Sequence, residues 1–224
     1  ALDVGDGFVI NGIDAGDRSG RSVSSAGDIN GDGIDDLIIG APYADPNDNS
    51  MAGESYVVFG KDTAFDTELE LVGLNGSNGF VLEGINDYDF TGKSVSSAGD
   101  INGDGIDDLI IGAHRADPNG DRNAGASYVV FGRNTAVNGN FDSTLDLSNL
   151  NGANGFVIEG INEYDKSGYS VSSAGDINGD GIDDLIIGAY GADPDGNFYA
   201  GETYVVFGKD TAVATFAATL ELSS

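Results

Sequence analysis

Residues 22–41 read SVSSAGDINGDGIDDLIIGA, and the same twenty residues recur unchanged at 94–113 and 170–189. Each copy begins with small and β-branched residues, passes through a run of Asp, Asn and Gly, and ends in the apolar segment DLIIGA. Short β-branched segments bounded by Gly, Asn and Asp are typical of strands joined by turns. The stretch therefore predicts a β-hairpin with a polar loop, repeated three times along the chain.

Further landmarks accompany each copy. The segment YVVFG begins at Tyr56, Tyr128 and Tyr204, and a segment beginning GFV lies at 7–9, 79–81 and 155–157. Each repeat thus reads as four short strands, and four strands in a repeat of about 70 residues are typical of a propeller blade. Helical periodicity is weak throughout, with 211–222 the nearest candidate. We expect an all-β fold of propeller blades, each with four antiparallel strands, and three blades per chain.

The two ends of the chain together have the length of one connector between repeats. The connector 133–155 has 23 residues, which is also the combined length of the 16 residues after Gly208 and the first seven residues. We therefore treat 1–224 as a single unit, in which residues 7–13 complete the blade of 170–208 by strand exchange between termini. Because propellers have about 4–8 blades, we expect a homodimer of head-to-tail chains that closes a six-bladed ring. The alternative is a three-repeat piece of a longer array.

The polar loop carries the candidate chemistry. Counted from Asp28, oxygen-bearing side chains occupy positions 1, 3, 5 and 9, and position 6 is Gly33. Oxygen ligands in such a short turn, with a backbone carbonyl from position 7, suit Ca²⁺. We predict three calcium ions per chain, one in each loop. The predicted ligands are Asp28, Asn30, Asp32, Ile34 and Asp36; Asp100, Asn102, Asp104, Ile106 and Asp108; and Asp176, Asn178, Asp180, Ile182 and Asp184.

Two alternatives compete with this interpretation. An EF-hand requires a bidentate Glu at position 12, where this chain has Ile39, and a helix where it has the strand-like LII. Asx-type turns that need no metal are the second alternative. Three identical copies favour metal binding. Asp35, Asp107 and Asp183 lie beside position 9 and are expected to face solvent, while Asp17, Asp89 and Asp165 are expected to form turns or caps rather than to orient the loops.

Composition narrows the function classes. The chain has 38 acidic and nine basic residues, and its formal charge of -29 disfavours nucleic acid and anionic membrane surfaces as partners. It has no cysteine, which excludes disulfides and thiolate metal sites. No apolar run approaches the ~20 residues of a membrane span, so no membrane insertion is expected. His114 is the single histidine, and its place in a variable loop position disfavours a catalytic role.

The pattern G-x-S-V followed by D-x-N-x-D-G-x-x-D-L-I-I-G-A resembles the FG-GAP repeat of the integrin α-subunit β-propeller. The resemblance covers all three repeats, although the naming F-G pair is replaced by Ser19-Gly20, Thr91-Gly92 and Ser167-Gly168. In that family the repeat forms a four-stranded blade whose first loop binds calcium. The resemblance implies the ligands named above. The near-identical copies resemble bacterial relatives or an engineered repeat chain.

Together these features predict a non-enzymatic calcium-binding module, extracellular or at the cell surface, for adhesion or protein binding, with calcium in a structural role. A lectin-like glycan-binding propeller is one alternative, and an enzymatic site at the ring mouth is another. An engineered or structural repeat scaffold without a natural ligand is the third. The loop residues Tyr43, His114, Arg115 and Tyr190 differ between otherwise matched repeats, and such varied positions on a fixed scaffold are where recognition is expected.

Overall fold

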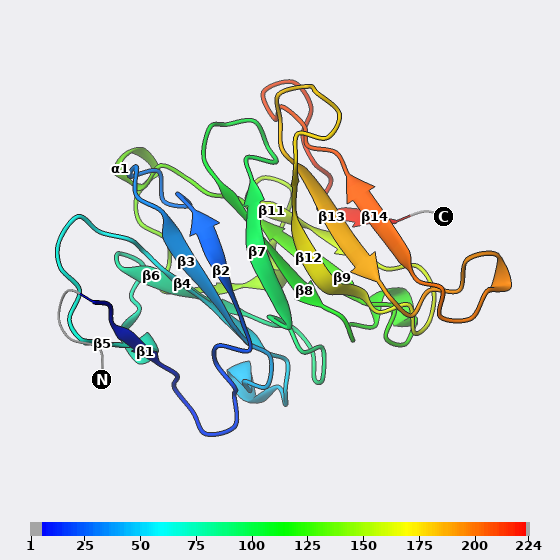
Figure 1. Ribbon diagram of the computed structural model, residues 1–224, viewed down its shortest axis with the longest axis horizontal. Coiled ribbons are helices and arrows are strands. Elements are labelled where there is room, and N and C mark those ends of the chain that lie inside the picture. Colours follow the sequence, from blue (N-terminus) through cyan, green and yellow to red (C-terminus); the bar gives the residue numbers. More distant parts are fainter. Residues whose placement is uncertain (1–5, 223–224) are drawn as a thin grey trace.

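A computed structural model describes residues 6–222 of the chain. The fold is all-β, as predicted, and its strands form four sheets (Figure 1). Among the described residues the one α-helix is α1 (Thr135–Asn138), and no helix there is long and apolar enough to cross a membrane. The strands are β1 (Val9–Asn11), β2 (Ser22–Gly27), β3 (Asp36–Ala41), β4 (Glu54–Val58), β5 (Glu68–Glu70), β6 (Gly79–Glu83), β7 (Ser94–Gly99), β8 (Asp108–Ala113), β9 (Ala126–Val130), β10 (Thr144–Asp146), β11 (Gly155–Glu159), β12 (Ser167–Gly175), β13 (Asp184–Ala189), β14 (Glu202–Val206) and β15 (Thr219–Glu221).

The three predicted hairpins are present. β2 pairs antiparallel with β3, β7 with β8, and β12 with β13, and each pair encloses one polar loop. The third strand of each repeat begins two residues before the predicted YVVFG segment and ends before its Phe-Gly pair. Apolar Val, Ile and Leu side chains fill these strands because both faces of each sheet are covered wherever a neighbouring sheet is present.

The sheets differ from the predicted blades of four strands. The first two contain five strands each, in the orders β10-β6-β4-β3-β2 and β15-β11-β9-β8-β7, whereas the third contains only β12-β13-β14. The additional strands are β10, in the connector that follows β9, and β15, in the connector that follows β14. Each belongs to the next repeat along the chain, and they pair in parallel with β6 and β11. Each is three residues long, too short to show a period of its own. Segment 211–222 is likewise not helical and contributes β15.

The N-terminal strand does not join the sheet of 170–208 within one chain. β1 pairs in parallel with β5, and this pair lies at one end of the row of sheets, while β14 lies at the other end (Figure 1). The reason is geometric, since three sheets in a row separate the two ends. Closure of a ring by strand exchange therefore requires another chain and stays a prediction.

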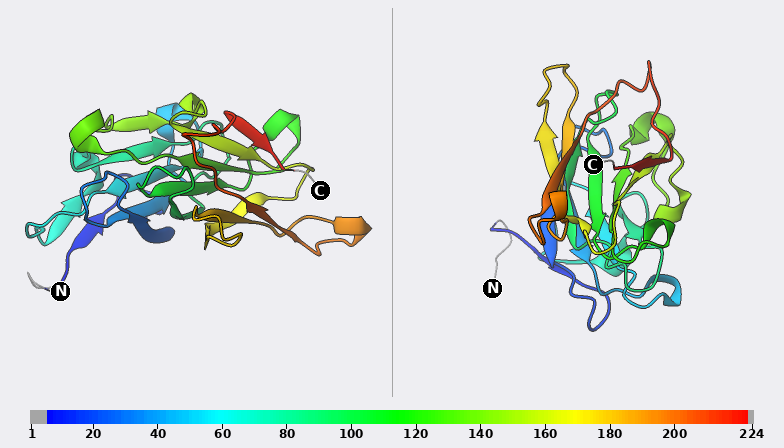
Figure 2. Two further views of the ribbon diagram at one scale, coloured as in Figure 1. Left: turned by 90° about the horizontal axis from the view of Figure 1, so that it is seen from above. Right: turned by 90° about the vertical axis from the view of Figure 1, so that its right-hand side faces the viewer.

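Apolar side chains between successive sheets form the core. Ile38 and Val57 of the first sheet, with Ile29 of its polar loop, pack with Val95 and Leu109 of the second sheet in one cluster. A second cluster joins the second and third sheets in the same way. The first strands of the repeats, β2, β7 and β12, lie next to one another. Figure 2 shows the β13–β14 end projecting from the row. Each sheet is thus stabilised mainly by its neighbours.

Candidate metal centre

Each polar loop folds back on its own first carboxylate. The Asp28 carboxylate accepts hydrogen bonds from the N–H groups of Asp32 and Gly33, at 2.9 and 2.8 Å. Asp32 in turn accepts from the N–H of Ile34 at 2.9 Å. Gly33 has a φ of 91°, which favours glycine and permits the tight turn. The second and third loops repeat these contacts, so positions 1 and 5 are held in the loop by backbone donors.

The aspartate at position 9 ties the loop to the end of the third strand. Asp36 is buried and accepts from the N–H of Ile29 at 3.1 Å and from the N–H of Gly60 at 2.7 Å. Asp108 and Asp184 make the corresponding bonds in the other repeats. The glycine of YVVFG is thus part of the site, a role that sequence reasoning missed. Its recurrence 24 residues after each position 9 is the signal that marks it.

Burial and neighbouring carboxylates both disfavour the ionised form of the position 9 aspartate in the first and second loops. Burial, with the charges of Asp32 and Asp28, raises the pKa of Asp36 to about 7. Burial and the charges of Asp104 and Asp100 raise the pKa of Asp108 well above its ordinary value. A cation in the loop would favour the ionised forms, because an opposite charge lowers a carboxyl pKa.

The donor chemistry fits a hard cation. The Asn30 side chain is only 3% exposed, and its Oδ1 is buried without a hydrogen-bond partner. A buried amide oxygen left unpaired is costly, so a ligand for it is expected. Within residues 6–222, however, no three Asp, Glu or His side chains converge closely enough to form a ready-made site. The loops bring their predicted ligands into one short turn, and calcium binding stays a prediction.

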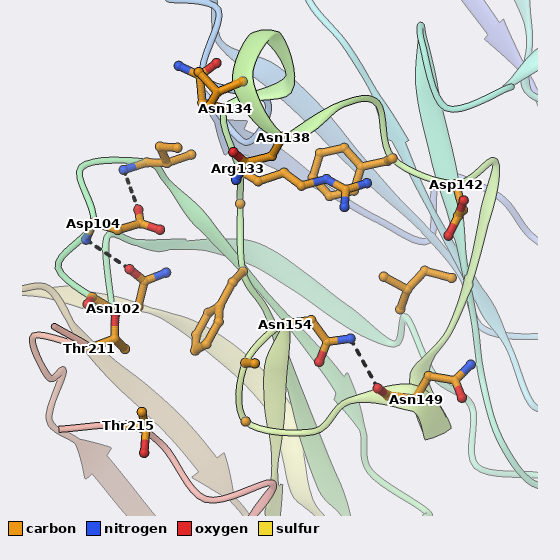
Figure 3. Close-up of a pocket in the computed structure, with 18 of the residues that line it drawn as sticks. Asn102, Asp104, Arg133, Asn134, Asn138, Asp142, Asn149, Asn154, Thr211 and Thr215 are labelled. Atoms are coloured by element: carbon orange, nitrogen blue, oxygen red, sulfur yellow. Dashed lines mark hydrogen bonds between the residues drawn. The ribbon is translucent and has the colours of Figure 1, made fainter.

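A polar hollow of about 590 Å³ lies beside the second loop. Figure 3 shows Asn102 and Asp104 on one side of it, Asp142 on the other, and Arg133 between them. Thr211, from the connector of the third repeat, donates from its Oγ1 to the carbonyl oxygen of Asn102 at 3.1 Å. A smaller hollow beside the first loop has the corresponding lining. The first and second loops therefore each border an open polar hollow.

The aspartate at position 8 joins neighbouring repeats, which corrects the expectation that it faces solvent. The Asp107 carboxylate accepts from the N–H of Asp28 at 2.8 Å, and that of Asp183 accepts from the N–H of Asp100 at 3.1 Å. Only Asp35 of the three side chains is exposed. The contacts span 79 and 83 residues, so no local pattern could have predicted them.

The connector after the third strand also braces the preceding loop. The N–H of Thr135 donates to the carbonyl oxygen of Asn30 at 2.9 Å, and the N–H of Thr211 donates to that of Asn102 at 2.9 Å. The first and second loops are thus supported by the repeat that follows them. The third loop has no such support within residues 6–222.

A second distinctive surface lies at the opposite ends of the strands, because Ser22 at the start of β2 pairs with Gly40 near the end of β3. Aromatic rings there form a continuous row across the three repeats, with centroid distances of 4.6–6.0 Å between neighbours. Four of the nine basic side chains lie over these rings. We call this surface the cation–aromatic row, and it comprises Arg18, Tyr43, Phe90, Lys93, His114, Arg115, Lys166, Tyr169 and Tyr190.

His114 lies buried within this row. Burial and the charges of Arg115, Lys93 and Lys166 lower its pKa to about 4. Its Nδ1 has no hydrogen-bond partner. A neutral, enclosed imidazole packed against aromatic rings acts as a core side chain. Asp17, Asp89 and Asp165 each accept a local hydrogen bond from the residue three positions earlier, which confirms the turn interpretation.

Comparison with known proteins assigns all three repeats to one family, the family that the sequence pattern resembles. The FG-GAP repeat model matches residues 19–58, 91–130 and 167–206. Integrin alpha-PS5 of Drosophila melanogaster is 32% identical over 83% of this chain and 16% of its own length. Integrin alpha-5 of Xenopus laevis is 31% identical over 78% of this chain and 15% of its own.

An enzyme also appears among the relatives. Phosphatidylinositol-glycan-specific phospholipase D of Bos taurus is 30% identical over 84% of this chain and 21% of its own length. The chain therefore spans about a fifth or less of these relatives. What is shared is the repeat, since the matched segments contain the three loop-bearing hairpins and their third strands. The chain belongs to the FG-GAP repeat family and is integrin-like.

Proposed function

We propose that this chain is a calcium-stabilised, non-enzymatic β-propeller module that binds a protein partner outside the cell or at its surface. The observation that carries the calcium part is made in the first loop, where the Oδ1 of Asn30 is buried and unpaired and burial with neighbouring carboxylates raises the pKa of Asp36. In the other two loops the Oδ1 atoms of Asn102 and Asn178 accept the N–H groups of Asp104 and Asp180, and the proposal extends to these loops because their sequences are identical. The relationship to integrin alpha chains supports the binding role. The formal charge of -29 disfavours nucleic acid as the partner.

Calcium would be held by the residues at positions 1, 3, 5, 7 and 9 of each loop. It would supply positive charge among carboxylates and bind hard oxygen atoms. The chain's own residues supply the rest of the function: Asp28 and Asp32 hold the turn closed, and Asp36 links it to the third strand. The calcium is therefore proposed to be structural.

Calorimetric titration tests this proposal. We expect three calcium ions per chain, and we expect a chelator to lower the melting temperature. Asp32→Asn, Asp104→Asn and Asp180→Asn together should abolish most of the binding heat while the Oδ1 acceptor for the N–H two residues on is kept. Asp48→Asn, Asp87→Asn and Asp195→Asn together, at exposed positions outside the loops, are the charge-matched control. Calcium binding that is unchanged in the triple variant would contradict the assignment.

We place the partner on the cation–aromatic row. Arg18 and Arg115 are exposed there, as are the rings of Tyr169 and Tyr190, on a chain that is otherwise strongly acidic. Such a surface favours acidic side chains of a protein partner. Immobilised poly-glutamate peptide is a suitable probe, and Lys93→Glu with Lys166→Glu should weaken its binding. Salt-independent binding, or binding unaffected by these changes, would contradict this placement.

The exposed tyrosines favour a second candidate, a lectin. Tyr88, Tyr164, Tyr169 and Tyr190 expose large parts of their rings, whose apolar faces can pack against sugars. Neutral oligosaccharides on an array separate the two functions, because a glycan partner would bind without dependence on Lys93 and Lys166. Binding of neutral glycans but not of the acidic peptide would replace protein recognition by glycan recognition.

The proposed assembly is a homodimer with six blades. Three repeat sheets per chain, apart from the two-stranded β1–β5 pair, are fewer than the roughly four to eight blades with which propellers close. Two chains arranged head to tail would provide six. Light scattering should then find twice the 22.9 kDa of one chain. A lone species of one chain's mass at all concentrations would contradict the dimer without affecting the calcium proposal.

A further inference from the structure

The third repeat exposes an apolar face that the first and second repeats bury. Ile177 is 61% exposed, whereas its counterparts Ile29 and Ile101 are fully buried under the following repeat. Phe207 is 54% exposed, against 8% and 9% for its two counterparts. Contiguous exposed apolar surface is typical of interaction sites. We call it the third-repeat face, and it comprises Ile177, Ile186, Val205 and Phe207.

The first repeat exposes the complementary face at the other end of the row. Val23 is 67% exposed, whereas Val95 and Val171, its counterparts, are each 6% exposed against the preceding repeat. An apolar hollow of about 200 Å³ lies here, bordered by Val23, Leu37 and Ile39. We call this surface the first-repeat face. The two faces are the two halves of an interface that the chain already makes twice internally.

The strand edges at these two faces also match. β1 has the hydrogen bonding of a fourth strand, since the N–H of Val9 donates to the carbonyl oxygen of Thr67 at 2.9 Å, as Val81 does to Ser143. Phe8 stacks on Phe65 at 4.3 Å, the distance found for the corresponding pair of the next repeat. Within residues 6–222, β1 pairs only with β5 and β14 only with β13. β1 is thus a preformed fourth strand, and β14 an edge without one.

The third loop likewise lacks the neighbour that contacts the second loop. A Cβ at Gly99 would lie 2.1 Å from Asp183 Oδ2, whereas a Cβ at Gly175 would meet nothing within 4 Å. The missing neighbour of the third loop would supply an aspartate at position 8. Asp35 is that aspartate at the other end of the chain, and it is exposed.

We propose that the third-repeat face binds the first-repeat face of a second copy of this chain. The partner's β1 pairs antiparallel with β14 in the register that β6 makes with β4, which places the partner's Phe8 opposite Val205. The partner's Asp35 accepts the N–H of Asp176. This inference rests on the proposed homodimer and adds its interface: each copy completes the third sheet and braces the third loop of the other.

The mass in solution of matched variants tests the interface. Val23→Asp and Phe207→Asp each place a charge on one of the two faces, and both side chains are exposed in the single chain, so folding is not expected to suffer. Each should raise the dissociation constant of the dimer at least about tenfold, as loss of a central apolar contact does. Val213→Asp is the control, because Val213 is 83% exposed and its counterpart Val137 stays 79% exposed although its repeat has a following neighbour.

The possible results distinguish failure of the proposed interface from failure of the proposed homodimer. A wild-type dimer that neither face variant dissociates overturns the interface and leaves the dimer standing. A wild type that stays at 22.9 kDa overturns both. Open oligomers larger than a dimer that both variants dissociate support the interface and overturn the six-bladed ring, since a head-to-tail contact closes only if its rotation permits.

Amide exchange on the wild type provides a second measurement that needs no substitution. Successive N–H groups of a strand point to opposite sides, so those of Phe8 and Ile10 face away from β5. They should become protected as the protein concentration rises through the dimerisation range. The exchange rate of the Val9 N–H, which already donates a hydrogen bond to the carbonyl oxygen of Thr67, should change much less. Concentration-independent exchange at Phe8 and Ile10 in a dimeric sample would overturn the proposed strand pairing.

Discussion

The metal-free chain is expected to lose stability as the pH rises, and calcium should reverse the loss. The relevant group is Asp36, whose pKa is raised from 3.8 to about 7 in the folded chain by burial and by Asp32 and Asp28. A carboxyl whose pKa is higher in the folded chain than in the unfolded chain binds its proton more tightly in the folded chain. This proton binding stabilises the folded chain fully at pH values below the unfolded pKa. The stabilisation is lost as the pH rises towards and through the folded pKa, because the unfolded chain is already ionised there.

The expected magnitude follows from the two pKa values. Between about pH 5 and about pH 8, Asp36 alone should lower the free energy of unfolding by about 2.5 kcal/mol in the absence of calcium. Asp108 shifts in the same direction and adds to the loss. A loss of this size is a substantial fraction of the ~5–15 kcal/mol that stabilises a typical protein. Lower pH values are unsuitable because the isoelectric point is about 4.1.

Urea unfolding at a series of pH values, with chelator or with calcium, measures the effect. With saturating calcium the decline should disappear, since the cation favours the ionised carboxylates. Asp32→Asn removes one of the interacting charges and should make the calcium-free decline shallower, while the exposed control Asp48→Asn should leave it largely unchanged. His114, whose pKa is lowered to about 4, makes stability rise over the same range, so the series is measured in a His114→Phe background. In that background, a calcium-free stability that is flat or rises between about pH 5 and about pH 8 would refute the reasoning.

Three further predictions use differences between the repeats. Gly99→Ala should destabilise the chain by roughly 2 kcal/mol more than Gly175→Ala, since both have a φ near 65° but only the first would press on Asp183; equal urea midpoints would contradict this. Ile101→Ala should cost about 2–5 kcal/mol and Ile177→Ala much less in the monomer, again by urea unfolding. His114→Phe should remove an acid-induced loss of about 1.6 kcal/mol between about pH 6.5 and about pH 5, because the lowered pKa of His114 makes its neutral form the stable one; an unchanged pH profile would count against it.

The sequence predicts what depends on local pattern. The twenty-residue copies contain the alternating apolar residues and turn glycines of a hairpin, and the structure confirms β2–β3 and its two counterparts. The all-β class follows from the same pattern. The predicted ligands share one short turn because they lie within nine consecutive residues, and the sequence alone shows that. Whether they hold calcium depends on affinity, which neither the pattern nor the hydrogen bonds determine.

The remaining features depend on residues far apart in the chain. β10 pairs with β6 across about 60 residues in parallel, and three residues such as TLD carry no sign of that partner. Asp107 looks like an exposed loop residue until the fold places it against Asp28. The GFV motif predicts the strand at Val9, but nothing in it indicates the partner β5. In each case the missing information was which repeat lies next to which.

The proposed cation site and the contact between repeats share backbone groups. The N–H of Asp28 is fixed by Asp107 of the next repeat, while the carboxylate of Asp28 closes the loop through Asp32 and Gly33. The carbonyl oxygen of Asn30, at position 3, is fixed by Thr135. An ion that orders these residues therefore orders groups that also contact the neighbouring sheet. In a repeat protein, stability arises from the repeats and from the interfaces between neighbours. Calcium would thus stabilise both the individual repeats and the interfaces between them. Its removal should loosen the contacts between sheets as well as the loops themselves.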